Sequence, residues 1–226
     1  MAPTKARAPV ALAQFLTAKH ALDERSLDPS VRAALVQGLN ELETRACLDV
    51  GAGTGATAAR LLEWQVAQPW RLTLLEKDAQ LIGIARERAL QWLTERGHRP
   101  TIADDRIAGA DAGIAVQFVT RDIARHRPAA PYDGIIAHAV MDLLPLAATL
   151  GRFGEWLRPG GYLYAAIDYD GETVFEPRYG DAALEADLIG CYHDSMEARR
   201  VDGENTGGAY CGRRLRELLP AHGFAL

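Results

Sequence analysis

Residues 47–57 read Cys47-Leu48-Asp49-Val50-Gly51-Ala52-Gly53-Thr54-Gly55-Ala56-Thr57 and join a short apolar segment to a glycine-rich loop. Residues 47–50 have the character of a buried strand, and a helical pattern begins shortly after the loop. Glycine lets the backbone turn sharply and approach a ligand without a Cβ in the way. Because the helix directs unpaired N–H groups and its positive dipole end at the loop, this corner predicts a site for an anionic group or for the polar part of a nucleotide.

The glycine spacing alone does not identify the ligand. Gly51-x-Gly53-x-x-Ala56 also satisfies the relaxed dinucleotide-binding fingerprint. A glycine-rich connector without any ligand is the remaining alternative. The rest of the chain therefore has to decide among these interpretations.

Composition narrows the class of protein. At 226 residues the chain suits a single α/β domain, 1–226. The net charge of −5 argues against nucleic acid as a partner, and no apolar run is long enough to span a membrane. The three scattered cysteines lack a Cys-x-x-Cys pair, so we expect no disulfide framework, no metal site and a cytoplasmic location; they are Cys47, Cys191 and Cys211.

Strand and helix patterns alternate along the middle of the chain. Apolar segments at 47–50, 71–75, 116–119, 133–138 and 162–167 predict strands, and helical spacing appears at 57–64, 79–95 and 146–157. Residues 100–113 are expected to form an irregular polar excursion. The alternation predicts a Rossmann-like α/β fold, with a mainly parallel sheet and helices on both faces.

Additional segments flank this core. Residues 1–43 are expected to hold two helices, 9–21 and 28–43, that form a cap or an interface beside the glycine loop; the first is favoured over a signal peptide. Residues 169–209, with a helix at 182–199, are expected to be a substrate-binding or lid-like insertion after the fifth strand. Residues 210–226 predict a final helix and the start of a last strand, and an unfinished sheet edge there favours a homodimer.

Five segments in order resemble the class I S-adenosylmethionine-dependent methyltransferases: Leu48–Gly55, Leu74–Asp78, Arg121–Ile123, Tyr132–Ile136 and Leu157–Gly161. The resemblance covers roughly residues 44–168, the expected cofactor-binding core. Residues 175–200 are similar to a bacterial, small-molecule-type branch of this superfamily. The resemblance implies S-adenosyl-L-methionine as the cofactor and methyl transfer to a small-molecule acceptor.

The resemblance also implies roles for individual residues. Asp49 lies near the cofactor's amino group, Glu76 accepts hydrogen bonds from the ribose hydroxyls, and Asp122 accepts from the adenine amino group. The alternatives are a brace for the glycine turn at Asp49, and surface ion pairs of Glu76 with Lys77 and of Asp122 with neighbouring arginines. The full expected cofactor set is Asp49, Gly51, Ala52, Gly53, Gly55, Glu76, Lys77, Asp122, Ile123 and His138.

Methyl transfer from a sulfonium is an in-line displacement that needs alignment more than covalent catalysis. A base matters only when the acceptor arrives protonated. His138, at the end of the fourth strand, titrates near neutral pH and is one candidate for a catalytic role; another is that it lines the cofactor pocket. Asp142 and Tyr169 are further catalytic candidates, together with Asp168 and His193. A set of arginines could receive an acidic substrate or form a solvated helix face: Arg178, Arg199 and Arg200.

Two other functions remain open at this point. An NAD(P)-dependent oxidoreductase explains the glycines and Glu76, but not the combination of Asp49, Asp122 and Arg158-Pro159-Gly160-Gly161. A non-catalytic S-adenosylmethionine-binding protein would keep the pocket without turnover. The absence of an Asn/Asp-Pro-Pro-Tyr/Phe pattern after the fourth strand disfavours methylation of a base nitrogen or a protein amide.

Overall fold

The computed structural model describes residues 9–43, 45–166, 168–177 and 180–226, with side chains from Leu12 onward. The chain divides into two compact units. The N-terminal unit combines the chain up to Ile136 with Leu157–Tyr164, and the C-terminal unit combines Ala137–Trp156 with Ala165–Leu226. Ile167, the last residue of the expected fifth strand, and Arg178 lie outside the described residues.

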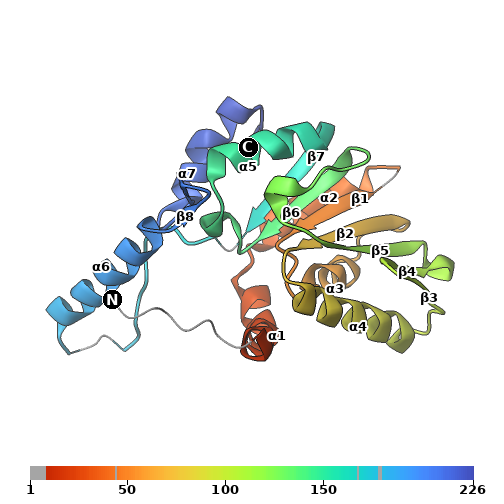
Figure 1. Cartoon of the computed structure of the whole chain (residues 1–226), viewed down its shortest axis with the longest axis horizontal. Helices are drawn as coiled ribbons and strands as arrows, with labels where there is room; N and C mark the ends of the chain where they lie inside the picture. Colours follow the sequence, from red (N-terminus) through yellow and green to blue (C-terminus); the bar gives the residue numbers. More distant parts are fainter. Residues whose placement is uncertain (1–8, 44, 167, 178–179) are drawn as a thin grey trace. The chain divides into compact units, whose positions relative to one another are not determined.

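A seven-stranded sheet runs in the order β3-β4-β5-β2-β1-β6-β7 (Figure 1). Strand β2 is parallel to both β1 and β5, and β6 is parallel to β1. These strands confirm the predicted α/β fold with a mainly parallel sheet. The five expected strands are β1 (Ala46–Val50), β2 (Trp70–Glu76), β5 (Ile114–Thr120), β6 (Tyr132–His138) and β7 (Leu157–Ala166).

The expectation of an irregular excursion at residues 100–113 was wrong. This segment forms β3 (Thr101–Ala103), β4 (Arg106–Gly109) and a 3₁₀ turn, η1 (Ala110–Ala112). Strand β4 pairs antiparallel with β3 and with β5, so the hairpin extends the sheet at one edge. Strands of three and four residues are too short to show an alternating pattern in the sequence. Strand β4 is stabilised by the burial of Ile107, which occurs only when β4 packs against other elements of the folded chain.

The described residues of the N-terminal unit form four α-helices: α1 (Pro9–Ser26), α2 (Pro29–Asn40), α3 (Ala56–Glu63) and α4 (Ala79–Glu95). The bounds of α4 are those predicted, because its apolar residues recur at helical spacing and Asp78 caps its start by accepting from Gln80 N and Leu81 N. Asp28 caps α2 in the same way. Figure 1 shows α3 and α4 on the same side of the strands, and α4 packs against β2, β4 and β5.

Asp133, in the Tyr132-Asp133-Gly134 segment, holds three strands together. Its Oδ2 accepts from Ala46 N at 2.6 Å, and its Oδ1 lies 2.8 Å from Arg158 Nε. Because Asp133 is buried in β6 while Ala46 begins β1 and Arg158 lies in β7, this carboxylate links the starts of neighbouring strands. Two segments of the family resemblance therefore contain residues with a structural role.

Asp133→Asn is expected to lower the free energy of unfolding by about 1–2 kcal/mol, because it weakens charge-assisted hydrogen bonds of a buried carboxylate. Urea unfolding measures the change. Arg158→Lys, which retains a charge at a more exposed position, is the control and should cost less. Equal stability of Asp133→Asn and the wild type would contradict this structural role.

The C-terminal unit holds η3 (Met141–Leu143), α5 (Leu146–Trp156), α6 (Ala182–Glu197), α7 (Cys211–Leu218) and η4 (Pro220–His222). A two-stranded ribbon, β8 (Arg200–Val201) and β9 (Glu204–Asn205), follows α6. Helix α6 therefore ends two residues before the predicted position. The expected start of a last strand at Phe224 was wrong: Phe224 N donates to Leu219 O, so the segment continues the turn after η4.

Candidate functional site

The glycine loop, residues 51–55, connects β1 to α3 in a tight conformation. Gly51 N and Ala52 N both donate to Leu75 O, at 2.9 and 3.1 Å, which ties the loop to the end of β2. Gly55 has a φ of 77°, and a Cβ built on it would lie 2.9 Å from Ala85 Cβ. Only glycine fits this position without displacing α4 or straining the backbone.

Helix α4 also holds the loop through a polar contact that the sequence did not predict. Arg88 Nη1 donates to Thr54 Oγ1 at 2.8 Å, and the hydroxyl-bearing side chain of Thr54 is buried. The sequence does show Arg88 on the helix after the second strand. Its position in the sequence does not distinguish it from Arg86 of the same helix, so the contact with Thr54 could not be predicted. The contact helps to fix the direction of the loop N–H groups.

Asp49 is the most unusual polar group beside the loop. It is 2 % exposed, and its Oδ2 has no hydrogen-bond partner among the described residues. Burial raises the pKa of Asp49 to about 7, while the Thr57 hydroxyl and the Arg60 guanidinium act in the opposite direction. A buried carboxylate oxygen without a donor is costly, so the position suits a ligand that brings a cation or a hydrogen-bond donor.

Glu76, at the end of β2, is turned toward the glycine loop. Its Oε2 accepts from Gly53 N and its Oε1 accepts from Asp78 N, both at 3.1 Å. Within the described part of the chain it makes no ion pair with Lys77, which is exposed. Each carboxylate oxygen offers a second lone pair, so Glu76 retains the capacity to accept from hydroxyl groups of a ligand.

Asp122 follows β5. It lies near Glu76 at the carboxyl ends of the parallel strands, because the register pairs Glu76 with Thr120. Its Oδ1 accepts from Ala124 N at 2.8 Å and caps the short turn η2 (Ile123–Arg125). No ion pair joins it to an arginine in the part of the chain that the structure describes, which argues against the surface-pair alternative. The side chain of Ile123 is half-buried.

Helix α1 packs against the glycine loop and against the second half of α3. A Cβ at Gly53 would lie 3.3 Å from Leu16 Cδ1, and the buried Arg60 forms an ion pair with Glu24 of α1. Trp64 Nε1 also donates to Glu24 at 3.4 Å. The sequence predicts a helical cap or an interface beside this loop but not these contacts. The available signal was a charged residue, Arg60, on the apolar face of α3.

An aromatic cluster forms in the C-terminal unit from Tyr169, Tyr192, His193 and Tyr210. The Tyr169 hydroxyl lies 2.8 Å from His193 Nε2 and 2.8 Å from Thr173 Oγ1. The guanidinium of Arg213 lies 4.9 Å from the centre of the Tyr210 ring. Two of the expected candidates, Tyr169 and His193, are therefore brought together from positions far apart in the sequence.

The other candidate catalytic residues lie elsewhere in the same unit. His138 ends β6 and is half-buried. Asp168 Oδ1 accepts from Met141 N at 3.0 Å; burial, followed by the charge of Asp142, raises the pKa of Asp168 to about 7. Asp142 Oδ2 lies 3.7 Å from Arg199 Nη1, so this arginine already has an acidic partner.

Within the described ranges, no group of three or more His, Cys, Asp or Glu side chains is placed to hold a metal ion. None of the helices described combines the length and the apolar character that crossing a bilayer requires.

Comparison with known proteins gives one family and a set of related folds. A family described as "methyltransferase domain" matches residues 48–163. Comparison with curated proteins finds no match. Human N-acetylserotonin methyltransferase, solved with S-adenosylmethionine (SAM), superposes with a TM-score of 0.53 at 15 % identity, over 97 % of this chain and 52 % of that one.

Two further solved structures are more distant in fold score. The mitomycin 7-O-methyltransferase is 20 % identical, with a TM-score of 0.49, over 96 % of this chain and 54 % of that one. A methyltransferase from Clostridium acetobutylicum is 13 % identical, with a TM-score of 0.45, over 66 % and 55 % of the two chains. This chain thus spans about half the length of these relatives. At such identities the superposition concerns the fold alone.

Proposed function

The chain belongs to the family of S-adenosylmethionine-dependent methyltransferase domains, and on that premise we propose that it transfers the methyl group of this cofactor to a small-molecule acceptor. The observation that carries the proposal is a buried carboxylate oxygen of Asp49 that has no partner among the described residues. It lies beside a glycine loop that connects a parallel strand to a helix. When bound, the cofactor supplies an electrophilic methyl group on a sulfonium and leaves as a neutral thioether.

The residues of the N-terminal unit fit such a cofactor. Loop N–H groups and the start of α3 suit the carboxylate of its methionine portion, and Asp49 suits the ammonium. Glu76 suits the ribose hydroxyls through its remaining lone pairs, and Asp122 suits the adenine amino group with Ile123 against the ring. The proposed cofactor set of this unit is completed by Gly51, Ala52, Gly53, Gly55 and Lys77.

For the acceptor we propose the aromatic cluster of the C-terminal unit as the recognition group. Aromatic side chains offer apolar surface to a small organic molecule, and the hydrogen-bonded Tyr169 and His193 offer a polar group that can hold or accept a proton. His138 and Asp142, with Asp168, remain alternative positions for proton transfer. The insertion 169–209 contributes most of the cluster, which supports its role in substrate binding.

A transfer assay tests the proposed function. Radiolabelled S-adenosylmethionine is incubated with the protein and fractionated metabolites, and the methylated species is identified by mass. Calorimetry with S-adenosylhomocysteine and with NADH accompanies it. Binding of NADH without S-adenosylhomocysteine would instead support an oxidoreductase, and cofactor binding without transfer to any fraction would support a non-catalytic binding protein.

Tyr169→Phe is expected to lower kcat about tenfold for the acceptor so identified, because it removes the hydroxyl that bonds His193. The affinity for S-adenosylhomocysteine should not change. Tyr192→Phe, in the same cluster but exposed, is the matched control and should retain its kcat. An equal loss of kcat in both variants would show that the hydrogen bond between Tyr169 and His193 is not the cause.

We also propose a cytoplasmic location and a homodimer. Three free cysteines support a reducing compartment. Strand β7 is last in the sheet order, so its outer edge offers backbone groups to a second copy. Sedimentation equilibrium distinguishes the dimer from a monomer.

A further inference from the structure

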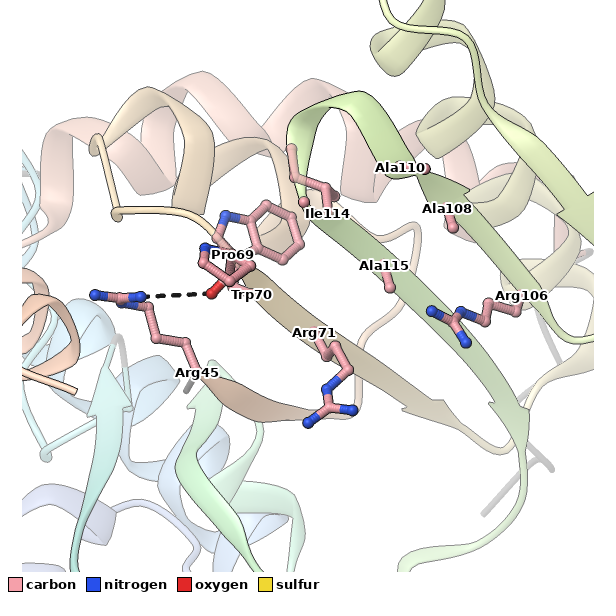
Figure 2. Close-up of a pocket in the computed structure, with 10 residues that line it drawn as sticks. Arg45, Pro69, Trp70, Arg71, Arg106, Ala108, Ala110, Ile114 and Ala115 are labelled. Atoms are coloured by element: carbon pink, nitrogen blue, oxygen red, sulfur yellow. Dashed lines mark hydrogen bonds between the residues drawn. The ribbon is translucent and has the colours of Figure 1, made fainter. Parts of the chain in front are cut away.

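A basic cleft opens where β2 and β5 begin (Figure 2). It therefore lies at the opposite ends of the parallel strands from the glycine loop, which follows the end of β1. Its volume is about 350 Å³. Its described lining includes no acidic residue and three arginines, Arg45, Arg71 and Arg106. Trp70, Ala108 and Ala115 also line it.

The strand register explains the shape of the cleft. Ala115 of β5 pairs with Arg71 of β2 on one side and with Ala108 of β4 on the other, so these three side chains share one face. Arg106, two residues before Ala108, lies on the same face. Because alanine side chains are short, Ala108 and Ala115 leave space between the long side chains of Arg71 and Arg106. Residues 121–131, all of which the structure describes, form only η2, so the crossover from β5 to β6 supplies no helix to cover this face.

The positive charges of the cleft have no acidic counterpart within the described residues. Arg71 and Arg106 are exposed and form no ion pair there. Asp105, beside Arg106, lies 3.4 Å from the Gln117 amide nitrogen. Arg45 is 8 % exposed and donates to the carbonyl oxygens of Leu39, Asn40 and Pro69 rather than to a carboxylate. The dashed line in Figure 2 marks the bond to Pro69.

Trp70 borders the cleft at the start of β2, but its indole does not face the arginines. Adjacent residues of a strand point to opposite faces, so Trp70 lies on the other face of β2 from Arg71, as Figure 2 shows, and is 2 % exposed. The donors of the cleft are therefore its arginines, and the positive charge of Arg71 and Arg106, which has no acidic partner among the described residues, suits an acceptor-rich anion.

We propose that this cleft is a second ligand site, which binds the phosphate group of a small phosphorylated metabolite. Two guanidinium groups balance a dianion, and a phosphate monoester carries about −1.5 to −2 charges at neutral pH. The planar fork of arginine matches phosphate oxygens with paired hydrogen bonds. The volume of the cleft suits a compact molecule rather than a polymer. The site is independent of the proposed methyl transfer.

Calorimetry with glycerol 3-phosphate as the probe tests the proposal, with glycerol and acetate as the neutral and singly charged comparisons. The wild type should bind glycerol 3-phosphate, more weakly as salt increases, and should bind neither comparison. Arg71→Ala/Arg106→Ala should weaken binding about a hundredfold, because each arginine contributes about a tenfold factor. Both side chains are exposed, so the variant should fold.

Arg25→Ala/Arg96→Ala removes the same charge from exposed positions outside the cleft and should retain the wild-type affinity. Arg71→Lys/Arg106→Lys keeps the charge, loses the fork and should bind with intermediate affinity. Affinity for S-adenosylhomocysteine should be the same in every variant. No heat of binding in the wild type, equal binding of acetate, or equal loss in both alanine variants would overturn the proposal.

Discussion

Asp49→Asn is expected to weaken the affinity for S-adenosylhomocysteine about a hundredfold. The substitution preserves the shape of the side chain but removes the charge that we propose to pair with the ammonium of the cofactor. Truncating one partner of a buried, hydrogen-bonded charge pair costs about 3 kcal/mol, which corresponds to about two powers of ten in affinity. Calorimetry measures the difference directly.

Asp104→Asn is the matched control, because Asp104 is an exposed carboxylate in the same unit. It should leave the affinity unchanged. If the affinity of Asp49→Asn for S-adenosylhomocysteine is within about twofold of the wild-type affinity, Asp49 only braces the glycine turn. That is the alternative role considered for Asp49 from the sequence.

The pH dependence of stability provides a second test of the environment of Asp49. Burial raises the pKa of Asp49 from 3.8 to about 7, so the folded protein keeps a proton that the unfolded chain has lost between these values. The stability contributed by this group is therefore fully present below 3.8 and declines as the pH rises through about 7. Relative to Asp49→Asn, the wild type should lose stability over that range, measured by urea unfolding at successive pH values. Asp168 titrates in both proteins and so does not affect the comparison.

Cofactor affinity should change in the opposite direction. The ammonium pairs with the ionised form of Asp49, so binding of S-adenosylhomocysteine to the wild type should strengthen as the pH rises toward about 7. The Asp49→Asn variant should show a flatter profile. Parallel pH profiles for the two proteins would contradict the assigned role.

Gly55→Ala is expected to lower the free energy of unfolding by about 3 kcal/mol, a large part of the total stability of a domain. An L residue in the left-handed conformation at this φ of 77° costs about 1–2 kcal/mol. The added Cβ would also lie 2.9 Å from Ala85 Cβ and 3.3 Å from Leu74 Cδ1, and overpacking of this kind costs about 1–3 kcal/mol. Urea unfolding gives the total.

Gly97→Ala separates the two contributions. Gly97 has a similar φ of 81°, but a Cβ there would meet nothing within 4 Å, so only the backbone strain applies. The loss in Gly55→Ala should therefore be the larger. Ala85→Gly, introduced with Gly55→Ala, should restore part of the difference by removing the clashing methyl group. Equal losses of unfolding free energy in Gly55→Ala and Gly97→Ala would show that α4 shifts to accommodate the added methyl group without cost.

The predictions that succeeded from sequence were local ones. Strands β1 and β2 and helix α4 were predicted nearly residue by residue, because hydrophobic period and N-cap chemistry act over a few neighbouring residues. The β3–β4 hairpin and the β8–β9 ribbon were missed, since strands of two to four residues have no measurable period. The last strand was expected on family pattern, whereas the hydrogen bond of Phe224 N continues a local turn.

The sequence by itself determined the α/β class, the glycine loop and the residue types that a methyl-donating cofactor requires. Only the tertiary structure decided their chemical state: Asp49 has a raised pKa because the surrounding elements exclude water from it. The same holds for the Tyr169–His193 hydrogen bond and for the arginines of the basic cleft. Periodicity depends on neighbours in the chain, whereas burial, pKa and charge pairing depend on residues that meet only when the chain has folded.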